Sequence, residues 1–184
     1  FEIWTQKLWQ LSRDIQQARK KYLADLVMQA QTIEGYFSDT HTFSITYQTK
    51  YLVGEQSFEE FSACNQRLFD KERLFKRSLF GAHLDDIEII FNEKPARLFS
   101  SRGQQKLLAL FLKIAQVFNL TQAHGPCIFL IDDFLADFDF LTMKRIIKTC
   151  LAAQSQIVFT TPLSSSPLEI ILHELQTDFR KISI

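Results

Sequence analysis

Two short apolar runs, CIFLI at residues 127–131 and QIVFT at residues 156–160, place the strongest constraint on the fold. A helical pattern from about Leu141 to Ala153 separates them, and the helical pattern LEIILHELQ follows the second run. Short continuous apolar runs are typical of strands buried on both faces of a parallel sheet, and alternation of strands with helices indicates α/β topology. We therefore predict parallel strands with flanking helices, and RKISI is a candidate for a last strand.

The first 80 residues follow a different pattern. One helical pattern runs from Phe1 to about Ile33, with apolar residues recurring at three and four. THTFSITYQTK alternates as a half-buried strand does, and a second helix is predicted from Ser57 to about Leu79. DIEIIF and KPARLF flank an Asn-Glu turn and predict a hairpin at the start of the second regime. We expect a mostly helical arm or lobe with a short β element over residues 1–80, followed by the α/β part over residues 81–184.

The overall composition narrows the class of protein. Lys plus Arg and Asp plus Glu are both 21 in 184 residues, which argues against a polybasic nucleic-acid wrapper and still permits a local basic face. No apolar stretch is long enough to span a membrane, and no signal peptide is evident. The three cysteines lack metal-binding spacing and predict buried, reduced thiols: Cys64, Cys127 and Cys150. The start at FEIWTQKL, without methionine, suggests a fragment.

The second helix carries a row of basic residues: Arg67, Lys71, Arg73, Lys76 and Arg77. Such a row, interleaved with Phe69 and Phe75, is able to follow the phosphate backbone of DNA. Such a row is more often a solvated helix face, and Asp70 and Glu72 dilute its charge. Both interpretations stay open. Trp4 and Trp9 are expected to contact the neighbour of the first helix.

The stretch SSRGQQ has more polar groups than a helix start requires. Ser101 is placed to cap a backbone N–H three residues on, and Gln104 to reach back, which makes a capping box. Gly103 in the first turn costs about 1 kcal/mol of helix propensity relative to alanine. Free N–H groups and the positive end of the helix dipole would bind an anion there. The alternative is a capped helix whose glycine merely eases packing.

CIFLIDDFLADFD places two aspartates at the end of a predicted strand. The carboxyl edge of such strands is where open α/β sheets bind their ligands. Asp132 would hold Mg²⁺, directly or through water, and Asp133 would polarise an attacking water. The alternative is that either aspartate caps the following segment.

SSRGQQK followed by LIDDFLADFD, with GAHLDDIEI before and SQIVFTT after, resembles the C-terminal half of the RecF family of bacterial recombination mediators. The resemblance implies the C-terminal part of an ABC-type ATPase head. It implies that the ABC signature contacts the γ-phosphate of ATP held by the opposite subunit of a homodimer, through Ser101, Arg102, Gly103 and Gln104. It also implies that Asp132 is the Walker B ligand of Mg²⁺, that Asp133 is the general base, and that the D-loop contributes Asp137 and Asp139 to the dimer interface.

The same resemblance implies a cytoplasmic protein that dimerises with ATP at junctions of single- and double-stranded DNA, and loads a recombinase with RecR and RecO. Thr161 stands at the switch position where many ABC ATPases have histidine, which predicts slow hydrolysis. No GxxxxGK(S/T) pattern occurs, so we expect the P-loop in an absent N-terminal part and no ATPase activity from this chain alone.

Two departures and two alternatives remain. GAHLDD differs from the family's GPHR-x-D at Ala82 and Leu84, which leaves the roles of His83, Asp85 and Asp86 open. A non-enzymatic helical-arm interaction module is one alternative function. Another ABC-type repair ATPase of the SMC or RecN kind is the second, although it would need a longer coiled coil.

Overall fold

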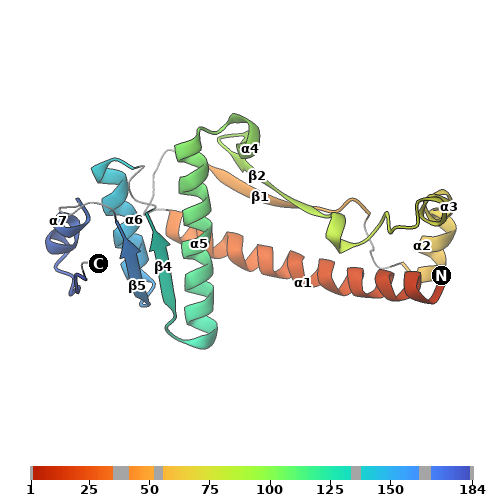
Figure 1. Cartoon of the computed structure of the whole chain (residues 1–184), viewed down its shortest axis with the longest axis horizontal. Helices are drawn as coiled ribbons and strands as arrows, with labels where there is room; N and C mark the ends of the chain where they lie inside the picture. Colours follow the sequence, from red (N-terminus) through yellow and green to blue (C-terminus); the bar gives the residue numbers. More distant parts are fainter. Residues whose placement is uncertain (1, 35–41, 52–55, 134–137, 162–166, 183–184) are drawn as a thin grey trace. The chain divides into compact units, whose positions relative to one another are not determined.

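The computed structural model describes residues 2–34, 42–51, 56–133, 138–161 and 167–182. The chain divides into two compact units: unit 1 comprises Phe1–Asp25 and Phe43–Pro95, and unit 2 comprises Leu26–Thr42 and Ala96–Ile184. The structure is mixed α/β and mostly helical, with a three-stranded sheet in the order β1-β2-β3 and a two-stranded sheet of β4 and β5 (Figure 1).

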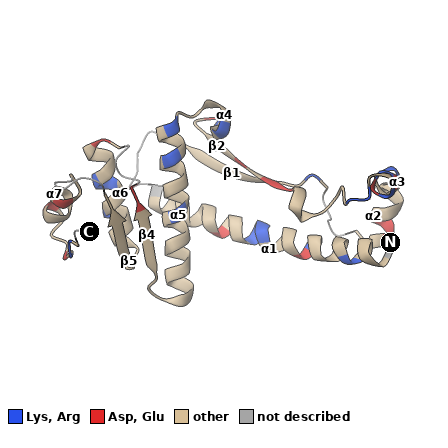
Figure 2. Ribbon diagram, in the orientation of Figure 1, with Lys and Arg blue, Asp and Glu red and all other residues tan. Residues whose placement is uncertain are grey.

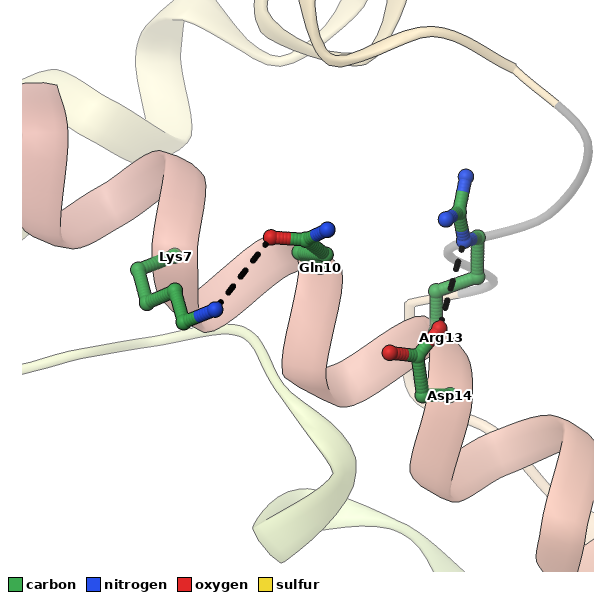
Figure 3. Close-up of polar contacts among 4 residues, drawn as sticks. All are labelled: Lys7, Gln10, Arg13 and Asp14. Atoms are coloured by element: carbon green, nitrogen blue, oxygen red, sulfur yellow. Dashed lines mark hydrogen bonds and ion pairs between the residues drawn. The ribbon is translucent and has the colours of Figure 1, made fainter.

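Helix α1 (Glu2–Glu34) confirms the long helix expected from the sequence. Within unit 1 the buried residues of α1 are Thr5, Trp9, Ser12 and Gln16, whereas the apolar residues Ile3, Leu11, Ile15 and Tyr22 are exposed. Two polar residues of this buried face bond to the segment before β2: Ser12 Oγ accepts the Ala82 amide at 3.2 Å, and Gln16 Nε2 donates to Asp85 Oδ2 at 2.9 Å. On the surface of α1, Lys7 Nζ donates to Gln10 Oε1 at 3.5 Å, and Arg13 Nε lies 3.7 Å from Asp14 Oδ1 (Figure 3).

An aromatic cluster forms the core of unit 1, made by Trp9, Phe61, Leu68, Phe69 and Phe80. The Phe61 and Phe80 ring centroids are 5.2 Å apart, within the range of favourable aromatic pairs. The expected contact of Trp9 is therefore confirmed. The same expectation is wrong for Trp4, whose side chain is 79% exposed.

The predicted helix over residues 57–79 is divided in two. Helix α2 (Phe58–Cys64) ends and helix α3 (Gln66–Phe75) begins around Asn65, whose φ of −119° and ψ of 28° are not helical. Helix α3 ends at Lys76, which adopts the left-handed conformation with φ 51°. The break at Asn65 allows both Phe61 and Phe69 to reach the aromatic cluster.

The three-stranded sheet is antiparallel. Strand β1 (Phe43–Gln48) pairs with β2 (Asp86–Phe91), which returns through the Asn92–Glu93 turn to β3 (Lys94–Pro95). Both turn residues have positive φ, as tight hairpin turns require. The predicted second hairpin strand, KPARLF, is wrong beyond Pro95: proline donates no hydrogen bond to extend the ladder, and helix α4 (Ala96–Phe99) follows.

Unit 2 contains the parallel strands. Helix α5 (Arg102–His124) continues past the predicted Asn119 and ends before Gly125, whose φ is 87°. Strand β4 (Ile128–Asp132), helix α6 (Phe140–Ala152), strand β5 (Gln156–Thr160) and helix α7 (Pro167–Glu174) follow in the expected order. The two strands are parallel, with Ile131 opposite Phe159.

The prediction that CIFLI is buried on both faces is wrong for the residues that the structure describes. Ile131 is 4% exposed, but Ile128 and Leu130 on the opposite face are 65% and 68% exposed. This alternation arises because only one face of the two-stranded sheet is covered by other described residues. RKISI does not form the candidate last strand over residues 180–182.

The structure shows the exposure of the cysteines and the character of the helices. Cys150 is buried, and burial raises the pKa of its thiol to about 12, whereas Cys64 is exposed, so the prediction of buried thiols is wrong for Cys64. Over the residues that the structure describes, none of the helices combines the length and the apolar character that a membrane crossing demands.

Candidate nucleotide-binding site

The N-terminus of α5 forms the predicted capping box. The Gln104 amide N–H donates to Ser101 Oγ at 3.3 Å, and the Ser101 amide N–H donates to Gln104 Oε1 at 2.8 Å. Gln105 Nε2 also donates to the Ser100 carbonyl at 3.1 Å, so α5 holds the end of α4 beside its own start. Ser101, Arg102 and Gly103 are exposed at this helix start.

Gly103 has no packing role among the described residues. A Cβ atom built on Gly103 would have no described atom within 4 Å outside its own helix backbone and chain neighbours. The interpretation that glycine merely eases packing is therefore not supported here. The helix nonetheless carries the propensity cost of a glycine, about 1 kcal/mol relative to alanine.

The second part of the candidate site is the carboxyl end of β4. In Figure 1 strand β4 is drawn in the direction opposite to α5, with its arrowhead directed toward the end of the picture at which α5 begins. Asp132 and Asp133 are both exposed. Asp133 has a φ of 41°, in the left-handed region that aspartate tolerates better than most residues. The two adjacent aspartates thus differ in backbone conformation: Asp132 is the last residue of β4, and Asp133 is left-handed.

The end of β5 contacts both aspartates. Thr160 is the register partner of Asp132; its hydroxyl donates to Asp132 Oδ1 and accepts the Asp133 amide N–H at 3.0 Å. Sequence reasoning selected the next residue, Thr161, as the switch position and missed Thr160. Aligning the two predicted parallel strands by their last residues would have indicated the pair.

The carboxylates at the end of β4 are compatible with a Mg²⁺ ion that is also bound by water and by substrate phosphates. Among the described residues there is no group of three His, Cys, Asp or Glu side chains that would hold a metal on its own. Mg²⁺ is usually bound by one or two carboxylates, several waters and substrate phosphates, so an exposed Asp132 with one oxygen engaged by Thr160 is compatible with it.

The D-loop prediction falls only partly within the described structure. Asp137 lies outside the described residues, whereas Asp139 is the N-cap of α6. The Thr142 hydroxyl donates to Asp139 Oδ2 at 2.7 Å and the Thr142 amide to Oδ1 at 3.0 Å, and these bonds hold the pKa of Asp139 below its usual value. Asp139 therefore caps α6. Its contribution to a dimer interface stays a prediction.

The GAHLDD segment provides a structural junction in unit 1. Asp85 accepts hydrogen bonds from the Tyr47 hydroxyl at 2.6 Å, Gln16 Nε2 at 2.9 Å and the Lys50 amide at 3.3 Å. Burial, together with the bond to Asp85, raises the pKa of Tyr47. Asp85 thus connects α1, β1 and the start of β2, a role that the sequence left open.

Asp85→Asn is expected to lower the free energy of unfolding of this chain by about 2 kcal/mol, because an amide replaces one acceptor oxygen by a donor that faces other donors. Urea unfolding measures the change. Asp86→Asn is the matched control: Asp86 is exposed and accepts the neighbouring Ile87 amide at 2.8 Å, so its effect should stay below about 0.5 kcal/mol. Equal unfolding midpoints for the two variants would contradict the junction.

The basic residues predicted to contact DNA are exposed on and after α3: Arg67, Lys71, Arg73, Lys76 and Arg77. Figure 2 shows blue on α3 and on the trace that follows it. Glu72 does not dilute this charge at the surface, because it is buried and accepts the Leu79 amide at 2.6 Å. Asp70 remains exposed, 3.8 Å from Arg73 Nη1, and Phe69 belongs to the core instead of the basic face.

The sequence of this chain is similar to those of known DNA replication and repair proteins. The DNA replication and repair protein RecF of Vibrio cholerae serotype O1 is 28% identical over 177 residues, covering 96% of this chain and 47% of the relative. RecF of Gloeobacter violaceus is 29% identical over 167 residues, covering 88% of this chain and 44% of the relative. The chain is homologous to RecF.

Solved structures agree in fold. The recombination mediator protein RecF of the RecFOR pathway with ATP has a TM-score of 0.69 and 22% identity, over 90% of this chain and 45% of RecF. RecF with ATPrS has a TM-score of 0.66 and 24% identity. No family model matches the chain. The chain thus spans less than half the length of the RecF relatives that it matches.

Proposed function

We propose that this chain is the C-terminal part of a RecF-like, ABC-type ATPase, with the arm or lobe over residues 1–80 and part of the ATPase head over residues 81–184. The main support for the proposal is the exposed position of Gly103 at the start of α5. Gly103 stands in the first turn of a capped helix, where it costs stability and no described neighbour needs it. A nucleotide phosphate that approaches the helix start closely would supply the missing reason for a glycine.

In this proposal the signature residues Ser101–Gln104 bind ATP that is held by a second copy of the protein. The Ser101 hydroxyl and the free N–H groups of the first turn donate to the γ-phosphate, and the positive charge of Arg102 lies beside them. Asp132 would hold Mg²⁺, and the ion would supply charge neutralisation on the phosphoryl group. Asp133 orients and deprotonates the attacking water. Thr161 at the switch position offers no imidazole, so the expected turnover is slow.

The proposed biological role is that of a bacterial, cytoplasmic recombination mediator. ATP-driven dimerisation on DNA near single-strand/double-strand junctions would allow recombinase loading together with RecR and RecO. In support, RecF relatives are DNA replication and repair proteins, and the exposed basic residues on and after α3 offer phosphate contacts.

A non-enzymatic interaction module is the second candidate. One observation favours it: Ile3 and Trp4 on α1 are 81% and 79% exposed, and large apolar side chains grouped at a surface are typical of protein contacts. In that case the arm would bind a partner and the aspartates at the end of β4 would only cap the following segment.

Calorimetry with ATP and Mg²⁺ separates the two candidates. The 184-residue chain alone should show no micromolar binding, because its sequence has no P-loop to hold the α- and β-phosphates. The full gene product should bind ATP in the micromolar range or tighter. Tight binding by this chain alone would overturn the proposed architecture, and failure of the full gene product to bind would favour the interaction module.

A further inference from the structure

The Thr160 hydroxyl bridges two groups that have different functions in the proposed site. It donates to the carboxylate of Asp132 and accepts the backbone N–H of Asp133. Thr160 is the last residue of β5 and pairs with Asp132 across the parallel ladder. One side chain therefore fixes a carboxylate orientation and a backbone conformation together.

Both constraints oppose motions that the strand end would otherwise allow. An exposed aspartate can rotate about its side-chain torsions, and a hydrogen bond to one carboxylate oxygen selects one orientation. Asp133 has a φ of 41°, a conformation that needs support from its surroundings to persist. The bond from its amide to Thr160 supplies part of that support.

We propose that Thr160 is the positioning residue of the magnesium and water-activating aspartates. This inference rests on the proposed function, because it assigns Thr160 a role toward the same Mg²⁺ and the same attacking water. With Oδ1 of Asp132 engaged by Thr160, Oδ2 is the oxygen assigned to the metal. Asp133 keeps its carboxylate for the attacking water, and its backbone is held in the left-handed conformation, φ 41°, with the bond from its amide to Thr160.

Thr160 could instead have a purely structural role and only hold the ends of β4 and β5 together. In that case its loss would lower folding stability and leave the Mg²⁺ requirement of nucleotide binding unchanged. A positioning residue changes metal affinity, and loss of a group that orients a metal ligand typically weakens metal binding about 10- to 100-fold. The two roles are therefore separable by a measurement that does not depend on ATP turnover.

The test uses three variants. Thr160→Val keeps the branched shape and removes the hydroxyl, and Thr160→Ser keeps the hydroxyl. Thr177→Val is the control, because it removes a hydroxyl that donates to the Leu175 carbonyl at 3.4 Å outside the site. Amide hydrogen exchange of Asp133 is followed in this chain. The Mg²⁺ concentration for half-maximal ATP binding is measured in the full gene product.

Thr160→Val is expected to speed Asp133 amide exchange about fivefold, the typical effect of one lost hydrogen bond. It should raise the Mg²⁺ midpoint about tenfold or more. Thr160→Ser and Thr177→Val should match the wild type in both measurements. An unchanged Mg²⁺ midpoint in Thr160→Val, with normal Mg²⁺-ATP binding by the wild type, would overturn the role of Thr160 alone. Absence of Mg²⁺-dependent ATP binding in the wild type would overturn the proposed function and this role with it.

Discussion

Asp133→Asn in the full gene product is expected to lower ATP turnover by about 100- to 10,000-fold, the usual contribution of a general base. Asparagine has nearly the same shape as aspartate and also tolerates the left-handed conformation found here, φ 41°. The substitution therefore removes the charge and preserves the backbone. ATP binding and ATP-driven dimerisation should remain, because the phosphate contacts lie elsewhere. Steady-state turnover and nucleotide affinity are the two measurements.

Asp178→Asn is the matched control, since Asp178 is an exposed aspartate beyond α7 and outside the proposed site. It should turn over ATP at the wild-type rate. An Asp133→Asn protein that is equally active would remove Asp133 from the catalytic role. The aspartate would then be a residue of the strand end without a chemical function.

Substitutions at Gly103 are expected to separate stability from assembly. Gly103→Ala should raise the free energy of unfolding of this chain by about 1 kcal/mol, because alanine favours the helix and its Cβ meets no described atom within 4 Å. Gly103→Val, with a bulkier side chain, should abolish ATP-dependent dimers of the full gene product by filling the space assigned to the γ-phosphate. Light scattering with ATP and Mg²⁺ measures the dimers.

Ser101 provides the matched pair for the same test. Ser101→Ala loses the cap and should cost about 1 kcal/mol of stability. Ser101→Asp preserves the cap, because aspartate caps as well as serine, but it places a negative charge against the phosphate. It should therefore fold normally and fail to dimerise with ATP. Normal dimers from both Ser101→Asp and Gly103→Val would contradict a phosphate at this helix start.

Local sequence signals predicted the elements of the candidate site well. The capping box at Ser101, the long α5 helix, and the order of β4, α6 and β5 all follow from short-range preferences of the chain. These elements are confirmed because their causes are local: a side-chain cap, an apolar period and a turn.

Predictions that depended on tertiary partners were less successful. The polar residues Ser12 and Gln16 of α1 are buried because Gln16 bonds to Asp85 and Ser12 accepts the Ala82 amide, partners far away in the sequence. The exposed face of β4 was missed because a continuous apolar run does not reveal which of its faces other elements cover. The role of Thr160 depends on strand register, which only the pairing of β4 with β5 determines.

Mixing two inactive variants of the full gene product tests the central claim, that this signature helix serves a nucleotide bound to another copy. One variant carries Gly103→Val with an intact P-loop, and the other carries an intact signature with its P-loop lysine replaced. Each alone should neither form ATP-dependent dimers nor hydrolyse ATP. The mixture should recover both, because one composite site per heterodimer combines the intact P-loop of one copy with the intact signature of the other. If each variant is folded and the mixture is as inactive as its components, Gly103 belongs to a site within a single copy and the composite site is wrong.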